Sequence, residues 1–193
     1  MCLKILEDSR LSVLLLKFDG DLAEIARASG CPCGGALHSA RYGRKPRGWA
    51  GSELDGYDWR HSFCCAEDGC RKRTTPASVR FLGPKVYLGA VVALVTALRH
   101  GANARRAAEL RRAIGASRRT LARWRTWWSE MFTATPFWRV ARAQWVPAVS
   151  EAALPASLLE RFAEGDPLIQ LVRLLEFIRP VTTSTGGRNS MGG

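Results

Sequence analysis

The chain has 193 residues, of which 47% are hydrophobic, and it carries a formal net charge of +12. This length and apolar content suffice for a packed core, which excludes a fully disordered chain, and no run of about 18 uncharged apolar residues that would span a membrane occurs. Because the basic start and the cleavage site of a secretory signal are both missing, we expect a cytoplasmic, nucleoid-associated protein whose cysteines stay reduced.

The N-terminal segment, residues 1–30, carries two short apolar stretches at 11–18 and 22–28. The residues that separate them are Asp19, Gly20 and Asp21. We therefore expect a helical N-terminal segment, in which the second stretch has the clearer helical pattern.

Residues 31–80 are rich in cysteine, glycine, proline and isolated aromatic residues, with little helical periodicity. Such a composition predicts a module of turns and short strands held together by a metal ion. Two cysteine pairs about 30 residues apart are typical of a zinc ribbon, in which each pair lies on a tight turn and the ion joins the turns. Gly34 and Gly35 would let backbone amides point at sulfur. The preferred ligands are Cys31, Cys33, Cys65 and Cys70.

The cysteine spacing leaves alternatives, because a ribbon turn usually has two residues between its cysteines and these pairs have one and four. Cys64 could replace Cys65, and His38 or His61 could replace a cysteine. A catalytic zinc site needs an open position and a nearby general base, and the sequence contains no His-Glu-x-x-His or His-x-Glu element. We therefore expect one Zn²⁺ ion with a structural role.

Helical periodicity begins after a connector at residues 80–86. Residues 86–98 predict a broad apolar helix that ends near His100 and Gly101. A second helix is predicted over residues 103–114, with Gly115 as its stop.

A third helix is predicted to begin at Ser117, a favourable N-cap. It carries Leu121, Trp124 and Trp128 at helical spacings of three and four, so these three side chains are expected to face the core. The order of inward residues and turns over residues 86–130 is that of a helix-turn-helix.

Arginine is concentrated in and after this region. Residues 99–145 hold eleven arginines, opposed only by Glu109 and Glu130, and at this density arginines repel one another unless an anion compensates. Outward-facing guanidinium groups on the third helix suit phosphate or a guanine edge in the major groove, while those on the second helix would cross the backbone. The candidate DNA contacts on these helices are Arg105, Arg106, Arg111, Arg112, Ser117, Arg118, Arg119, Thr120 and Arg123.

A second basic element occupies residues 42–48. Flexible basic arms that contain glycine and proline can lie in a minor groove, so Arg44, Lys45 and Arg47 are further candidates. A solvated loop of the metal module explains the same residues equally well.

Residues 131–181 are expected to contain two more amphipathic helices, at 158–162 and 168–178. Their apolar face exceeds what a short helix pair needs, which indicates homo-oligomerisation or docking to a recombinase. Residues 182–193 are small and polar and predict a disordered tail. The five tryptophans in residues 124–145 are expected mostly in the core.

The cysteine pattern between residues 31 and 70, the basic segment at 71–76 and the helix that starts at 117–124 together resemble the small zinc-ribbon plus helix-turn-helix proteins of bacterial insertion sequences. Such proteins are encoded with transposases or form their DNA-binding part. The resemblance covers residues 31–130. It implies binding to transposon ends or to the element's own promoter, with a transposase or recombinase as a partner.

These features together predict a mainly α fold with a small zinc ribbon, a helix-turn-helix and C-terminal amphipathic helices. The predicted function is binding of double-stranded DNA for a mobile genetic element, as a transposon-end accessory or a transcriptional regulator. An enzyme is not expected, because strand-transfer catalysis needs three separated carboxylates on a ribonuclease-H-like sheet. RNA binding and a protein-interaction adaptor role for a recombinase are the alternatives that fit the same charge.

Overall fold

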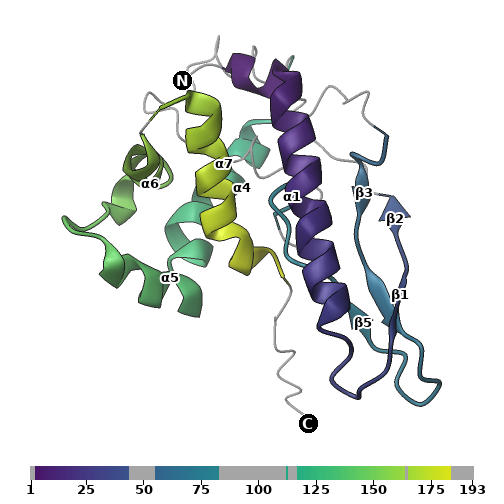
Figure 1. Ribbon diagram of the computed structural model, residues 1–193. Helices are drawn as coiled ribbons and strands as arrows, with labels where there is room; N and C mark the ends of the chain where they lie inside the picture. The colour runs from purple at the N-terminus through teal and green to yellow at the C-terminus, as the bar shows by residue number, and fades with distance from the viewer. Residues whose placement is uncertain (1–2, 44–54, 83–111, 113–116, 164, 184–193) are drawn as a thin grey trace.

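A long helix separates a small β region from a layer of short helices in the computed structural model, which describes residues 3–43, 55–82, 112, 117–163 and 165–183 (Figure 1). The long helix is α1 (Ser9–Ala28), and it follows the 3₁₀ turn η1 (Leu3–Glu7). The strands lie on one side of α1, and α5, α6 and α7 lie on the other (Figure 1).

Helix α1 is continuous through both apolar stretches of residues 1–30 and through the residues that separate them. Its N-cap is Asp8, whose carboxylate accepts a hydrogen bond from the Arg10 amide at 2.9 Å. Asp19, which lies between the two apolar stretches, is buried in the helix with 3% of its surface exposed. Its carboxylate accepts hydrogen bonds from the Arg80 guanidinium and the Ser78 hydroxyl, at 2.7 and 2.6 Å. Tertiary partners for the carboxylate therefore override the local signal for a break.

Five short strands form two antiparallel sheets. The first sheet has the order β1-β4-β5, and the second consists of β2 and β3. The strands are β1 (Leu37–Ser39), β2 (Tyr42–Gly43), β3 (Trp59–Arg60), β4 (Phe63–Cys65) and β5 (Arg73–Thr74). This agrees with the short strands and turns predicted for residues 31–80.

The helical layer is built from short segments that begin at side-chain caps. The hydroxyls of Ser117 and Thr135 and the carboxylate of Asp166 each accept a hydrogen bond from a backbone amide of the helix that follows. The helices are α4 (Arg118–Thr126), the π-helical segment η2 (Trp127–Phe132), α5 (Pro136–Ala141), α6 (Ala156–Leu159) and α7 (Pro167–Ile178). The 3₁₀ turns are η3 (Arg142–Gln144), η4 (Glu151–Ala153), η5 (Glu160–Phe162) and η6 (Arg179–Thr182).

Aromatic side chains fill the core between these helices and α1, as predicted for most of the tryptophans. Trp128 and Trp138 are almost completely buried, and Phe132 lies 5.0 Å from each of them between ring centroids. Helix α7 adds six buried residues to the same core: Leu168, Leu171, Val172, Leu174, Leu175 and Ile178. These six residues serve the chain's own core, and self-association or docking through this region stays a prediction.

Residues 80–82 and 182 also differ from expectation. Arg80 was expected in a connector, yet its side chain is fully buried, ion-paired to Asp19 and bonded to the carbonyl of Trp59 at 3.0 Å. Thr182 was expected in a disordered tail, yet it is buried, and its hydroxyl accepts a hydrogen bond from the Ser78 amide at 2.9 Å. Both residues hold segments distant in sequence together, which composition alone does not reveal.

The predicted helices at 86–98 and 103–114 and the residues between them lie outside the described residues. Arg112, in the second predicted helix, is the exception, and it is helical and exposed. The helix-turn-helix therefore stays a prediction. Within the described ranges, none of the helices combines the length and apolarity that crossing a lipid bilayer requires.

Candidate metal centre

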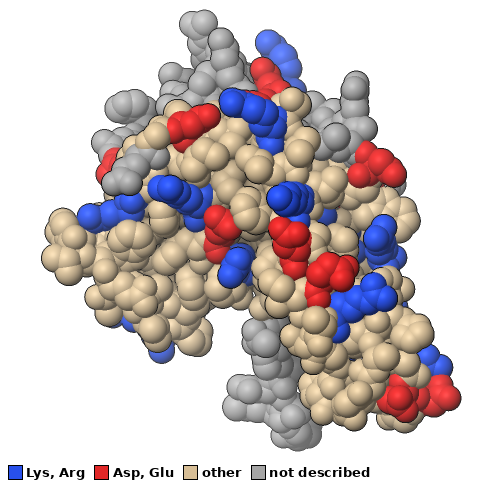
Figure 2. Space-filling view, in the orientation of Figure 1, with Lys and Arg blue, Asp and Glu red and all other residues tan. Residues whose placement is uncertain are grey.

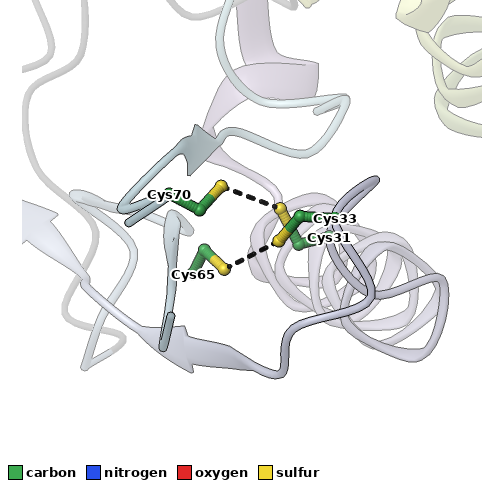
Figure 3. A group of neighbouring side chains, drawn as sticks. All are labelled: Cys31, Cys33, Cys65 and Cys70. Atoms are coloured by element: carbon green, nitrogen blue, oxygen red, sulfur yellow. Dashed lines mark hydrogen bonds between the residues drawn. The ribbon is translucent and has the colours of Figure 1, made fainter. Parts of the chain in front are cut away.

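Four cysteine side chains, two from the turn after α1, one from β4 and one from the turn that follows β4, converge beside the C-terminal end of α1 (Figure 3). The Sγ atoms of Cys31 and Cys70 lie 3.7 Å apart, and those of Cys33 and Cys65 lie 3.4 Å apart. All four sulfur atoms lie within 4.8 Å of one another. These are the four ligands preferred from the sequence.

The spacing of the sulfur atoms fits a tetrahedral metal site. Thiolate–zinc bonds of about 2.3 Å place the corners of a regular tetrahedron about 3.8 Å apart. The observed separations of 3.4 and 3.7 Å are close to that edge, and both are far longer than the covalent bond of about 2.05 Å in a disulfide. The donor set and its geometry are therefore compatible with a bound metal ion.

Hydrogen-bonded turns present the two cysteine pairs. In the first turn the Gly34 amide donates to the Cys31 carbonyl at 2.8 Å, and Gly34 has a φ of +86°, which favours glycine. In the second turn the amides of Cys70 and Arg71 both donate to the Glu67 carbonyl at 3.0 Å. Arg71 adopts a left-handed φ of 45°, so the turn tightens immediately after the last cysteine.

Backbone amides two residues further along the chain stabilise three of the sulfurs. The Gly35 amide donates to Cys33 and, together with the neighbouring thiols, lowers the pKa of Cys33 to about 7. The Glu67 amide also favours the thiolate of Cys65, but burial and the three other thiols outweigh it and raise the pKa of Cys65 to about 12.

Cys70 behaves in the same way as Cys65. The Lys72 amide favours its thiolate, but the thiols of Cys33 and Cys31 and burial raise its pKa. Four adjacent sulfurs thus resist complete ionisation on their own, whereas a bound cation deprotonates coordinating thiols.

Strand geometry explains why Cys65, and not Cys64, belongs to the cluster. Phe63 and Cys65 face inward along β4, and Cys64 points to the opposite face because side chains alternate along a strand. The Cys64 thiol contacts the Arg71 carbonyl at 3.5 Å. His38 pairs with Cys64 across β1 and β4 and is exposed. Neither it nor the half-buried His61 joins the four-thiol group found in the described part of the chain.

Gly35 has a packing role in the site that the sequence did not reveal. From the sequence we expected only its backbone amide to point at sulfur. A Cβ atom at Gly35 would lie 2.8 Å from the Cys65 sulfur and 3.4 Å from the Cys33 sulfur. It would also lie 2.6 Å from the Glu67 Cγ. No side chain fits here without displacing a sulfur, so glycine is needed for packing as well as for its amide.

The predicted orientation of α4 is confirmed. Leu121, Trp124 and Trp128 are buried, with 5%, 4% and 1% of their surface exposed. The arginines of the helix are all exposed: Arg118, Arg119, Arg123 and Arg125. Thr120 is half-buried and donates its amide to the Ser117 hydroxyl at 3.2 Å.

Six other candidate DNA contacts lie outside the described residues, so their positions relative to α4 are not described. They are Arg44, Lys45, Arg47, Arg105, Arg106 and Arg111. Comparisons of the chain with protein-family models, curated proteins and solved structures find no match.

Proposed function

We propose that the chain is a zinc-stabilised protein that binds double-stranded DNA through the exposed arginine face of α4. As the resemblance of its motifs implies, it would serve a mobile genetic element as a transposon-end accessory or a transcriptional regulator. The observation that carries the proposal is a helix whose apolar residues are buried and whose four arginines are all exposed. The four-thiol cluster supplies the metal site.

Zinc is the ion that best suits the donor set. Four thiolates in a closed tetrahedral arrangement are typical of structural Zn²⁺ sites, and a catalytic zinc usually keeps one position open for water. Three of the sulfurs accept amide hydrogen bonds, the kind of outer interaction that orients metal ligands. The residues that would hold the ion are Cys31, Cys33, Cys65 and Cys70.

The electrostatics of α4 favour an anionic partner. Arg118 and Arg119 lie in its first turn, where the helix dipole disfavours cations, and this turn contains no acidic residue. Within the described ranges neither arginine has a carboxylate within 4.0 Å. On the face that carries α1, by contrast, acidic and basic side chains are interspersed (Figure 2). A phosphate at the start of α4 would offset both the dipole and the mutual repulsion of the arginines.

A pair of double variants tests the arginine face. Arg118→Ala with Arg119→Ala removes two charges from α4, and Arg27→Ala with Arg173→Ala removes two exposed charges from α1 and α7. Affinity for a duplex is measured by fluorescence anisotropy over a series of salt concentrations. We expect the α4 variant to bind more weakly and to lose about one unit of salt slope for each phosphate contact removed, with the control close to the parent.

Two further measurements complete the test: competition of structured RNA with the duplex for the protein, and elemental analysis of the bound metal. Equal affinity of the two double variants would refute the role of α4, and preferential competition by RNA would replace DNA with RNA as the ligand. Elemental analysis of the protein purified without added metal is expected to give one zinc per chain. A protein without bound metal, or one whose metal is iron, would refute the zinc assignment.

A further inference from the structure

The four thiols of the metal centre differ strongly in exposure to solvent. Cys33 is exposed, Cys70 is half-buried, and Cys31 and Cys65 are buried, with 6% and 0% of their surface exposed. The sulfur nearest to the exposed Cys33, among the separations given above, is that of the fully buried Cys65, at 3.4 Å. A solvent-accessible sulfur beside a buried second sulfur is the arrangement found in redox-sensitive cysteine pairs.

We propose that Cys33 and Cys65 form a peroxide-sensitive pair, in which oxidation of Cys33 leads to a Cys33–Cys65 disulfide and release of the bound ion. The proposal deepens the proposed function and rests on it, because it assigns a modification to the same metal site. It makes DNA binding dependent on a reducing environment, since the site would lose two of its four sulfur donors.

The chemistry is balanced with a hydroperoxide as the oxidant. The Cys33 sulfur attacks one peroxide oxygen, the O–O bond breaks, and sulfenic acid and hydroxide are formed. The Cys65 sulfur then attacks the Cys33 sulfur, so that the S–S bond forms as the S–O bond breaks and a second hydroxide leaves. Two thiolates are oxidised by two electrons in total, and one peroxide is reduced.

The movement that the disulfide requires is small and spans the two turns. The sulfurs must approach from 3.4 Å to the covalent distance of about 2.05 Å. Cys33 lies in an exposed turn with glycines on its C-terminal side, whereas Cys65 is fixed in the middle of a three-stranded sheet. We therefore expect the Cys33 turn to move toward β4 and not the reverse.

The experiment treats the full-length, zinc-loaded protein with hydrogen peroxide. Released zinc is followed with a chromogenic indicator, and disulfides are mapped by mass spectrometry after alkylation of the remaining thiols. The Cys64→Ser variant, which alters a thiol outside the cluster, serves as the control and makes the assignment of Cys65 unambiguous. The Cys33→His variant keeps four metal-binding side chains but lacks the exposed sulfur.

We expect the first disulfide to join Cys33 to Cys65, with zinc release at the same rate. Cys64→Ser should behave like the parent, and Cys33→His should release zinc about tenfold more slowly. A first disulfide that omits either residue, or parental release from Cys33→His, would overturn the proposal. If Cys33→His does not load zinc, disulfide mapping in the parent protein tests the proposal by itself. Absence of zinc from the parent counts against the proposed function, whereas a zinc-loaded protein with peroxide-inert thiols counts only against this inference.

Discussion

Substituting Gly35 by alanine tests the metal site without touching a ligand. The added Cβ would lie 2.8 Å from the Cys65 sulfur, and ordinary contact begins at 3.4 Å, so one of the two groups must move by 3.4 − 2.8 = 0.6 Å. The clash with Glu67 can be relieved because that side chain is exposed, but Cys65 is fully buried in β4. The strain therefore falls on the sulfur.

A displacement of this size exceeds what a metal centre tolerates. Ligand distances in functional sites stay within about 0.2 Å of their ideal values. Loss of an outer-shell interaction typically weakens metal affinity about 10–100-fold, which corresponds to about 1.4–2.8 kcal/mol, and we expect Gly35→Ala to fall in this range.

The assay is competition for zinc between the protein and a chromogenic chelator. Gly69→Ala is the matched control, because Gly69 lies next to Cys70 in the second turn and a Cβ there meets nothing within 4 Å. Zinc binding by Gly35→Ala as tight as that of Gly69→Ala would refute the packing argument. A loss of affinity in both variants would instead indicate that the turns tolerate no substitution.

Three further predictions concern the buried Asp19–Arg80 ion pair, His61 and removal of the metal ion. Asp19→Ala leaves the Arg80 guanidinium buried without its carboxylate, so the free energy of unfolding in urea should fall by about 3–5 kcal/mol, and a loss no larger than that of the exposed Asp21→Ala would contradict this. Burial, and then the Arg80 cation, lower the pKa of His61. As the pH falls, the unfolded chain therefore takes up the proton first, and the free energy of unfolding declines below about pH 6.5. His61→Gln should lack this part of the pH dependence when its free energy of unfolding and that of the parent are measured by urea titration at several pH values. Removal of the ion by a chelator should lower the free energy of unfolding, followed by tryptophan fluorescence in urea, by about 2.7 kcal/mol relative to ion present at 100 times its Kd. An unchanged free energy would show that the centre does not stabilise the helical core.

The clustering of four cysteines could be predicted from the sequence because its signal is local. Two cysteine clusters next to glycines and polar turn residues indicate a metal module whatever the rest of the chain does. The choice between Cys64 and Cys65 was different, because spacing permits both. It depends on the register of β4, where the inward position of Phe63 places Cys65 inward as well.

The helical periodicity of α4 was also sufficient to predict its buried residues, since three apolar residues at spacings of three and four define one buried side. The continuous α1 was not predictable in the same way. Asp19 and Gly20 resemble a break in sequence, and only partners 59 to 61 positions away, Ser78, Val79 and Arg80, make a buried aspartate favourable in mid-helix. The prediction that Arg80 lies in a connector was wrong for the same reason, because its partner Asp19 is equally distant in sequence.

Helix α1 connects the metal centre to the core that carries α4. Ala23 packs with Cys31, Leu37, Phe63 and Cys65 in the small cluster beside the thiols. Earlier on the same helix, Leu11 and Leu15 belong to the large core that also contains Leu121 and Trp124 of α4. A rigid helix shared by two clusters transmits order between them, because a shift at its C-terminal end alters the packing of its N-terminal half. We therefore expect that a metal ion bound to the four thiols would stabilise the support of α4 as well as the module that contains them.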